Sequence, residues 1–263
     1  MDQHPAAAHS DPAAVAGGSD SLIAVRTIRR STAIDANAVL RGRLRECDRL
    51  LPRPGTTPLN PPAIAWEEFC DPDRPWLSGC VEEWQRRGGF RHRRAGIVLV
   101  AFRFGWLACC ATVPEHHLGA PVPSLSGLRV VVNDEGRLTT LRPTGRAPGG
   151  ADQWWRQLRE AFEPLTEALH ALGGPRPDSH EYWGNPVGLI GPVLWRLQQA
   201  GIPGDAPATA RELRAATSRP ELLDIDERLR PWARRRTCCQ YWRGTGGYCD
   251  ECVLWNSASR LSG

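Results

Sequence analysis

A stripe of hydrophobic residues at helical spacing marks the stretch between residues 152 and 172. Apolar side chains three and four positions apart fall on one face of a helix, so this stretch predicts an amphipathic helix. Asp152 stands at its start, where an N-cap is expected, and two glycines follow its end. The same spacing predicts a shorter helix over residues 76–87, which is also followed by two glycines.

Two further helices are predicted nearer the C-terminus. The first covers residues 186–200, with Asn185 as its N-cap and Pro186 in its first turn, where a missing N–H costs nothing. The second begins at Thr209, because Thr209 and Glu212 have the spacing of a capping box.

A β-hairpin is predicted between the helical stretches. Residues 128–133 and 137–141 are rich in Val, Leu and Thr, and a short polar turn that ends in Gly136 separates them. Glycine adopts the positive φ that such a turn needs, so the two runs pair naturally as antiparallel strands. Together these patterns predict an α+β fold, a predominantly helical body with a small antiparallel hairpin.

The most apolar part of the chain is the run over residues 95–113, which only Arg103 interrupts. A membrane-spanning helix needs about 20 apolar residues, and a charge near its middle costs roughly 2.5–3.5 kcal/mol. We therefore expect a buried core segment and no transmembrane span, while a peripheral contact with a membrane stays open. The pattern leaves open whether the run is one helix or a pair of strands.

Composition narrows the class of protein. The chain has 263 residues, 33 basic and 29 acidic side chains and a net charge of +4, and all of its basic side chains except histidine are arginines. This length suits a globular protein with a core, and so weak a charge gives no reason to expect nucleic-acid binding. Residues 1–20 are poor in large apolar groups, which predicts a flexible tail, and they lack the pattern of a secretory signal peptide. We therefore expect a cytoplasmic protein with reduced thiols.

Four of the nine cysteines lie within fifteen residues near the C-terminus: Cys238, Cys239, Cys249 and Cys252. The last two form a Cys-x-x-Cys motif, whose sulfurs can converge on one metal site, and a glycine-containing loop can bring the adjacent pair to the other side. Four thiolates could hold a [2Fe–2S] cluster or one structural zinc ion. An adjacent pair favours the two-metal cluster, since structural zinc sites use two separated pairs. A redox dithiol or a group of surface thiols also stays open.

This segment resembles the C-terminal iron–sulfur motif of the FhuF-like ferric siderophore reductases. The likeness extends to residues 182–185, which look like the Trp-Gly-Asn step of that family, and to the order of helix, hairpin, long helix and glycine break over residues 94–174. The residues of the C-terminal segment that carry it are Arg235, Arg236, Thr237, Cys238, Cys239, Tyr241, Trp242, Arg243, Gly246, Gly247, Cys249, Cys252 and Leu254.

The resemblance implies a cytoplasmic enzyme, loosely associated at most with the inner face of the membrane, that passes one electron to a ferric siderophore and so releases ferrous iron. After the tail that composition predicts over residues 1–20, we expect an α+β body over residues 21–232 and a cluster-binding lobe over residues 233–263. The four clustered cysteines would ligate a [2Fe–2S] cluster. Its potential would be tuned by nearby arginines: Arg234, Arg235, Arg236 and Arg243.

Two other functions fit the same residues. Zinc could staple the C-terminal segment of a non-enzymatic module that binds a siderophore or a protein partner. Alternatively, an iron–sulfur centre could relay electrons to another oxidoreductase. The chain has no nucleotide-binding or flavin-binding motif, so each redox reading requires an external electron donor.

Overall fold

The computed structural model describes residues 42–43, 45–47 and 63–244. The chain divides into two units, Met1–Gly42 and Arg43–Gly263, and the fold below is that of the second unit. The predicted tail over residues 1–20 lies outside the described residues. In chain order the elements are β1 (Ile64–Ala65), α2 (Trp66–Phe69), α3 (Pro75–Gly88), α4 (Arg93–His117), β2 (Val122–Pro123), β3 (Arg129–Val132), β4 (Leu138–Arg142), β5 (Arg146–Ala147), α5 (Ala151–Ala171), α6 (His180–Gln199), α7 (Ala206–Ala216), η1 (Pro220–Leu222), β6 (Leu223–Ile225), β7 (Ala233–Arg235) and η2 (Tyr241–Arg243).

The apolar run is a single helix, α4, which settles the choice that the sequence pattern left open. This helix is long and apolar enough to cross a membrane, but 83% of its most apolar window is buried inside the protein, as in the core helix of a globular fold. Arg103 does not break the core, because its Nε donates to the carbonyl of Leu138 on β4 over 2.9 Å. The guanidinium of Arg103 therefore points away from the helical core and toward the β-hairpin.

A row of aromatic rings holds the helices together around α4. Phe104 on α4 stacks on Trp66 of α2 at 4.8 Å and on Phe162 of α5 at 5.6 Å between ring centroids. Phe162 in turn meets Trp183 of α6 edge-on at 5.0 Å. Such pairs add about 0.5–1.5 kcal/mol each beyond the area they bury. The row therefore fixes the start of α6 relative to the core.

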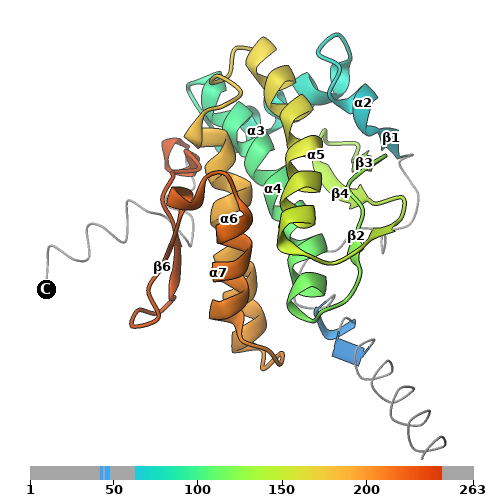
Figure 1. Ribbon diagram of the computed structural model, residues 1–263. Helices are drawn as coiled ribbons and strands as arrows, with labels where there is room; N and C mark the ends of the chain where they lie inside the picture. Colours follow the sequence, from blue (N-terminus) through green and yellow to red (C-terminus); the bar gives the residue numbers. More distant parts are fainter. Residues whose placement is uncertain (1–41, 44, 48–62, 245–263) are drawn as a thin grey trace, which may run out of the picture. The chain divides into compact units, whose positions relative to one another are not determined.

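The strands form three small antiparallel sheets, with the orders β1-β3-β4, β2-β5 and β6-β7. The predicted hairpin is confirmed as β3 and β4, and Gly136 in its turn has a φ of 81°. In Figure 1 the hairpin of β3 and β4 lies to the right of α4 and α5, and the β6-β7 pair runs alongside α6 on the left. The fold is thus mixed helix and small antiparallel sheet, as predicted.

The helix over residues 76–87 is confirmed as α3, and its C-cap Gly89 adopts the left-handed conformation with a φ of 60°. The helix predicted to begin at Pro186 is wrong at its start, because α6 begins at His180 and Ser179 caps it by accepting from the N–H of Glu181. Asn185 is therefore inside the helix, fully buried. The burial of Tyr182 and Trp183 stabilises the extra turn.

Two other predicted helix starts also differ. Gly150 stands at the N-cap position of α5, and Asp152 lies in the first turn without capping it. The N-cap of α7 is Asp205, whose carboxylate accepts from the N–H of Ala208, so Thr209 and Glu212 do not form a capping box. Both helices begin earlier than the spacing of their polar residues suggested.

We predict that Phe104→Ala lowers the free energy of unfolding by about 3–5 kcal/mol, because it removes a fully buried ring that stacks on two others. Trp76→Ala is the matched control, since this ring is 37% exposed, and we expect a change within about 1 kcal/mol. Urea denaturation measures both. Equal stability of the two variants would contradict the central position given to Phe104.

Candidate functional site

The structure describes part of the predicted site. Cys238 and Cys239 follow β7; of the predicted tuning residues, Arg234 and Arg235 lie in β7, Arg236 directly follows it and Arg243 ends η2. Cys249 and Cys252 lie outside the described residues, so the predicted set of four thiols cannot be assembled from what is described. Within the described ranges, no three His, Cys, Asp or Glu side chains are grouped so that they could hold a metal ion.

A glycine face of α6 carries the segment that leads to the cysteines. Gly184, Gly188 and Gly191 share one side of the helix, and alternate residues of the segment, Ala233, Arg235 and Thr237, meet them. A Cβ atom on each glycine would stand 1.7 Å from the Oγ1 of Thr237, 2.6 Å from the Cβ of Arg235 and 2.3 Å from the Cβ of Ala233, respectively. Only glycine permits this approach, so α6 determines where Cys238 and Cys239 lie.

A buried polar contact fixes the register of this packing. The Nη2 of Arg235 donates to the Oδ1 of Asn185 over 2.7 Å, and the Nδ2 of Asn185 donates to the carbonyl of Glu181 over 2.9 Å. Arg235 is only 3% exposed, and its guanidinium lies 5.4 Å from the ring centroid of Phe102. Its Nε and Nη1 have no hydrogen-bond partner, and it has no carboxylate partner, within residues 63–244. A buried guanidinium in such surroundings favours a nearby negative charge.

The two adjacent cysteines have different surroundings. Cys239 is 2% exposed and packs in a small apolar cluster with Phe90, Ala95 and Leu99. Cys238 is partly exposed, and its Sγ accepts from the backbone N–H of Gln240 over 3.4 Å. Amide hydrogen bonds to sulfur are a usual means of stabilising cysteine ligands of iron–sulfur clusters.

A tight turn follows the cysteines. Gln240 adopts a left-handed conformation with a φ of 64°, which is uncommon for a residue other than glycine, and η2 begins directly after it. Gly244 ends the turn against α3, since a Cβ on it would stand 2.2 Å from the carbonyl oxygen of Gly88. The turn is thereby held against α3 on one side, while Cys239 packs on the first turns of α4.

The other arginines of the segment differ in exposure. Arg236 is exposed, and its Nη1 lies 3.6 Å from a carboxylate oxygen of Asp224. Arg243 stacks over the exposed ring of Trp242, with 5.0 Å between its Cζ and the ring centroid, and its Nε donates to the side-chain oxygen of Gln240. Arg234 has a buried Nε and Nη1 without a hydrogen-bond partner among the described residues. Arg235 is therefore the most buried of the four predicted tuning residues.

A depression of about 490 Å³ adjoins the turn. It lies between the start of α4, the start of α6 and the residues that follow Cys239. Its lining residues are His92, Arg94, Ala95, Glu181, Gln240 and Arg243. Arg94 and Glu181 form an ion pair through two hydrogen bonds, so the acidic side chain among the described lining residues already has a partner.

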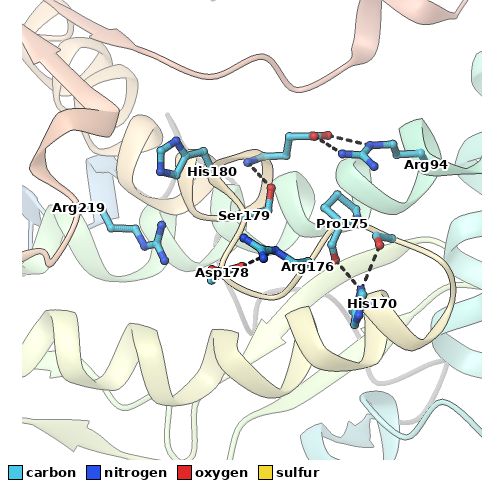
Figure 2. Close-up of a pocket in the computed structure, with 10 residues that line it drawn as sticks. Arg94, His170, Pro175, Arg176, Asp178, Ser179, His180 and Arg219 are labelled. Atoms are coloured by element: carbon cyan, nitrogen blue, oxygen red, sulfur yellow. Dashed lines mark hydrogen bonds and ion pairs between the residues drawn. The ribbon is translucent and has the colours of Figure 1, made fainter.

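A second depression, of about 650 Å³, shares Arg94 and Glu181 with the first. Figure 2 shows that the loop between α5 and α6 forms much of its wall, and that Arg176 turns toward Asp178. The figure also shows Arg219 on the far side, without a dashed contact to another lining residue. The guanidinium of Arg219 lies 5.6 Å from the ring centroid of Trp183.

Apart from Arg243, sequence reasoning missed the residues that line these depressions. Arg94 has no local sequence signal for this role, because its pairing with Glu181 joins positions 87 residues apart. Tyr182 was also missed as a polar group of the interior. It is fully buried, its hydroxyl has no hydrogen-bond partner in the described ranges, and burial raises the pKa of this phenol above its usual range. Its position before a Trp-Gly-Asn step was the only local signal.

The described residues after β7 include several features that an anionic, thiolate-ligated metal group would require. The segment supplies two thiols, an amide hydrogen bond to one of them, an apolar wall at the other and a buried cation nearby. Compared with models of protein families and with curated proteins, the chain has no match.

We predict that Gly184→Ala lowers the free energy of unfolding by about 1–3 kcal/mol, because the new methyl group overlaps Thr237. Gly79→Ala on α3 is the matched control, since its Cβ would meet nothing within 4 Å, and we expect it to stabilise the protein by about 0.4–1 kcal/mol. Thermal and urea unfolding measure both. If Gly184→Ala is as stable as Gly79→Ala, α6 does not hold the cysteine segment as described.

Proposed function

We propose that this chain is a [2Fe–2S] ferric siderophore reductase, which releases iron by adding one electron to chelated Fe(III). The observation that carries the proposal is the contact between two segments about fifty residues apart. The Gly184-Asn185 step packs on Arg235 and Thr237, directly before Cys238. Both segments carry the sequence resemblance to the FhuF-like reductases, and their contact supports a shared role.

The proposed reaction is an electron transfer without a covalent step. One electron reduces Fe(III) in the chelate to Fe(II), which oxygen chelators hold far less tightly. An external one-electron donor would then reduce the oxidised protein again. The cluster would supply a site that takes up and gives out single electrons. Cys238 and Cys239, with Cys249 and Cys252, would hold it.

The protein's own residues would position and tune this group. Arg235 would offset its negative charge from the buried side, and the amide of Gln240 would stabilise the sulfur of Cys238. Phe90 and Leu99 would keep water away from Cys239. We propose the cytoplasm as the site of action, because the thiols must stay reduced until they bind metal.

The identity of the bound metal is the first test. We expect protein purified without oxygen to be red-brown, to contain equal amounts of iron and acid-labile sulfide, and to lose visible absorption on reduction. Cys238→Ser should lose most of this iron. Cys70→Ser should keep it, because this buried thiol lies at the end of α2 and does not belong to the predicted cluster ligands. A colourless protein with one zinc per chain would support the zinc-stapled module instead.

The electron acceptor is tested with the same preparation. The reduced protein should transfer its electron to ferric trihydroxamate complexes, as followed by trapping Fe(II) with a ferrous-specific chelator. Iron–sulfur protein that reduces no ferric chelate would contradict the reductase assignment and favour a relay to another oxidoreductase.

Arg235 and Arg236 form a matched pair for the tuning role. Reduction adds a negative charge to the cluster, so a nearby buried cation favours the reduced form and raises the potential. We expect Arg235→Gln to lower the midpoint potential by roughly 40–90 mV, for a lost interaction of about 1–2 kcal/mol. Arg236→Gln should change it much less, because this side chain is 63% exposed and paired with Asp224. A redox titration of both variants measures this, and equal shifts would contradict the role of Arg235.

A further inference from the structure

We propose that the depression beside the cysteine turn is a docking site for metal chelates with a net negative charge. The inference rests on the proposed function for what happens to the metal, but it is a claim about binding alone. It makes anionic ferric chelates the preferred substrate class and places them against Gln240 and Arg243.

Position is the first argument. The depression is lined by Gln240, which directly follows Cys239, and by Arg243 at the end of the same turn. Its other walls come from His92, Arg94 and Ala95 at the start of α4 and from Glu181 on α6. A volume of about 490 Å³ falls within the roughly 300–1,000 Å³ of small-molecule sites. A chelate held here would lie next to the cysteine pair.

Charge is the second argument. Arg94 and Glu181 neutralise each other through two hydrogen bonds. The Nε of Arg243 donates to a neutral partner, the side-chain oxygen of Gln240, so no carboxylate of the described residues neutralises this guanidinium. His92 adds a further donor to the lining. Among the described residues, the depression therefore offers a ligand one uncompensated positive charge and no uncompensated negative charge.

The larger depression is a weaker candidate, although it too is basic. Two of its arginines are paired within it, Arg94 with Glu181 and Arg176 with Asp178, the latter over 3.5 Å (Figure 2). Of the three arginines that line this depression, Arg219 alone has no carboxylate partner among the described residues. Moreover, none of its lining residues belongs to the segment that carries Cys238 and Cys239.

Gallium(III) complexes test docking without electron transfer, because gallium(III) mimics the size and charge of ferric iron and is not reduced in its place. The probes are a trianionic gallium tris-catecholate and a neutral gallium tris-hydroxamate, titrated calorimetrically into the full chain as isolated. We expect the trianion to bind at least about tenfold more tightly at low salt, and this preference to shrink as salt rises. Equal affinity for both probes would overturn the proposal.

Two arginines provide matched variants. Arg243 and Arg219 each stack on a tryptophan, and each lies in a different one of the two depressions. Arg243→Gln should weaken binding of the trianion about tenfold and leave the neutral complex unchanged, Arg243→Lys should retain most of the affinity, and Arg219→Gln should have an effect below about twofold. A loss confined to Arg219→Gln would place the ligand in the larger depression and overturn the proposal.

The outcome is separable from that of the proposed function. A chain that prefers the trianion but contains no iron–sulfur cluster would refute the reductase and keep the docking site. A chain with a cluster that reduces ferric chelates without charge preference, and with Arg243→Gln unaffected, would refute only the docking site.

Discussion

The close approach of α6 to the segment over residues 233–237 is the contact on which the candidate site depends. Three glycines, at positions 184, 188 and 191, have no side chains of their own, so the side chains of Ala233, Arg235 and Thr237 pack directly on the backbone of the helix. The hydrogen bond from Arg235 to Asn185 then selects one register. Because the aromatic row from Trp66 to Trp183 anchors α6 in the core, the segment that carries Cys238 and Cys239 is held against a helix of the buried core.

The same contact buries a positive charge. Burial of a guanidinium without a carboxylate costs several kcal/mol, and such an arrangement persists where another negative group or a function compensates it. Asn185 and the ring of Phe102 stabilise Arg235 in part. Four thiolates and two sulfides outweigh the charge of two ferric ions, so the proposed iron–sulfur cluster would supply the negative charge that Arg235 lacks among the described residues. Structure and proposed chemistry are consistent at this point.

Local patterns predicted the parts of the fold that local physics controls. Gly136 marked the hairpin and two glycines marked the end of α3, because turns and helix ends depend on a few neighbouring residues. The start of α6 was wrong, since the burial of Tyr182 and Trp183 extends the helix back to Ser179 and turns a presumed cap, Asn185, into a buried partner of Arg235. The cysteine pair and its arginines were predicted as a site from spacing and resemblance. The Arg94–Glu181 pair was not, because it joins distant segments.

X-ray absorption on the protein as isolated tests the central claim most directly, since it identifies the metal and its neighbours without requiring activity. The account predicts an iron absorption edge, a first shell of sulfur and a second shell that contains one iron atom, which is lost in a variant without Cys238. A zinc edge with a first shell of sulfur and no metal neighbour, or the absence of any bound metal, would contradict it.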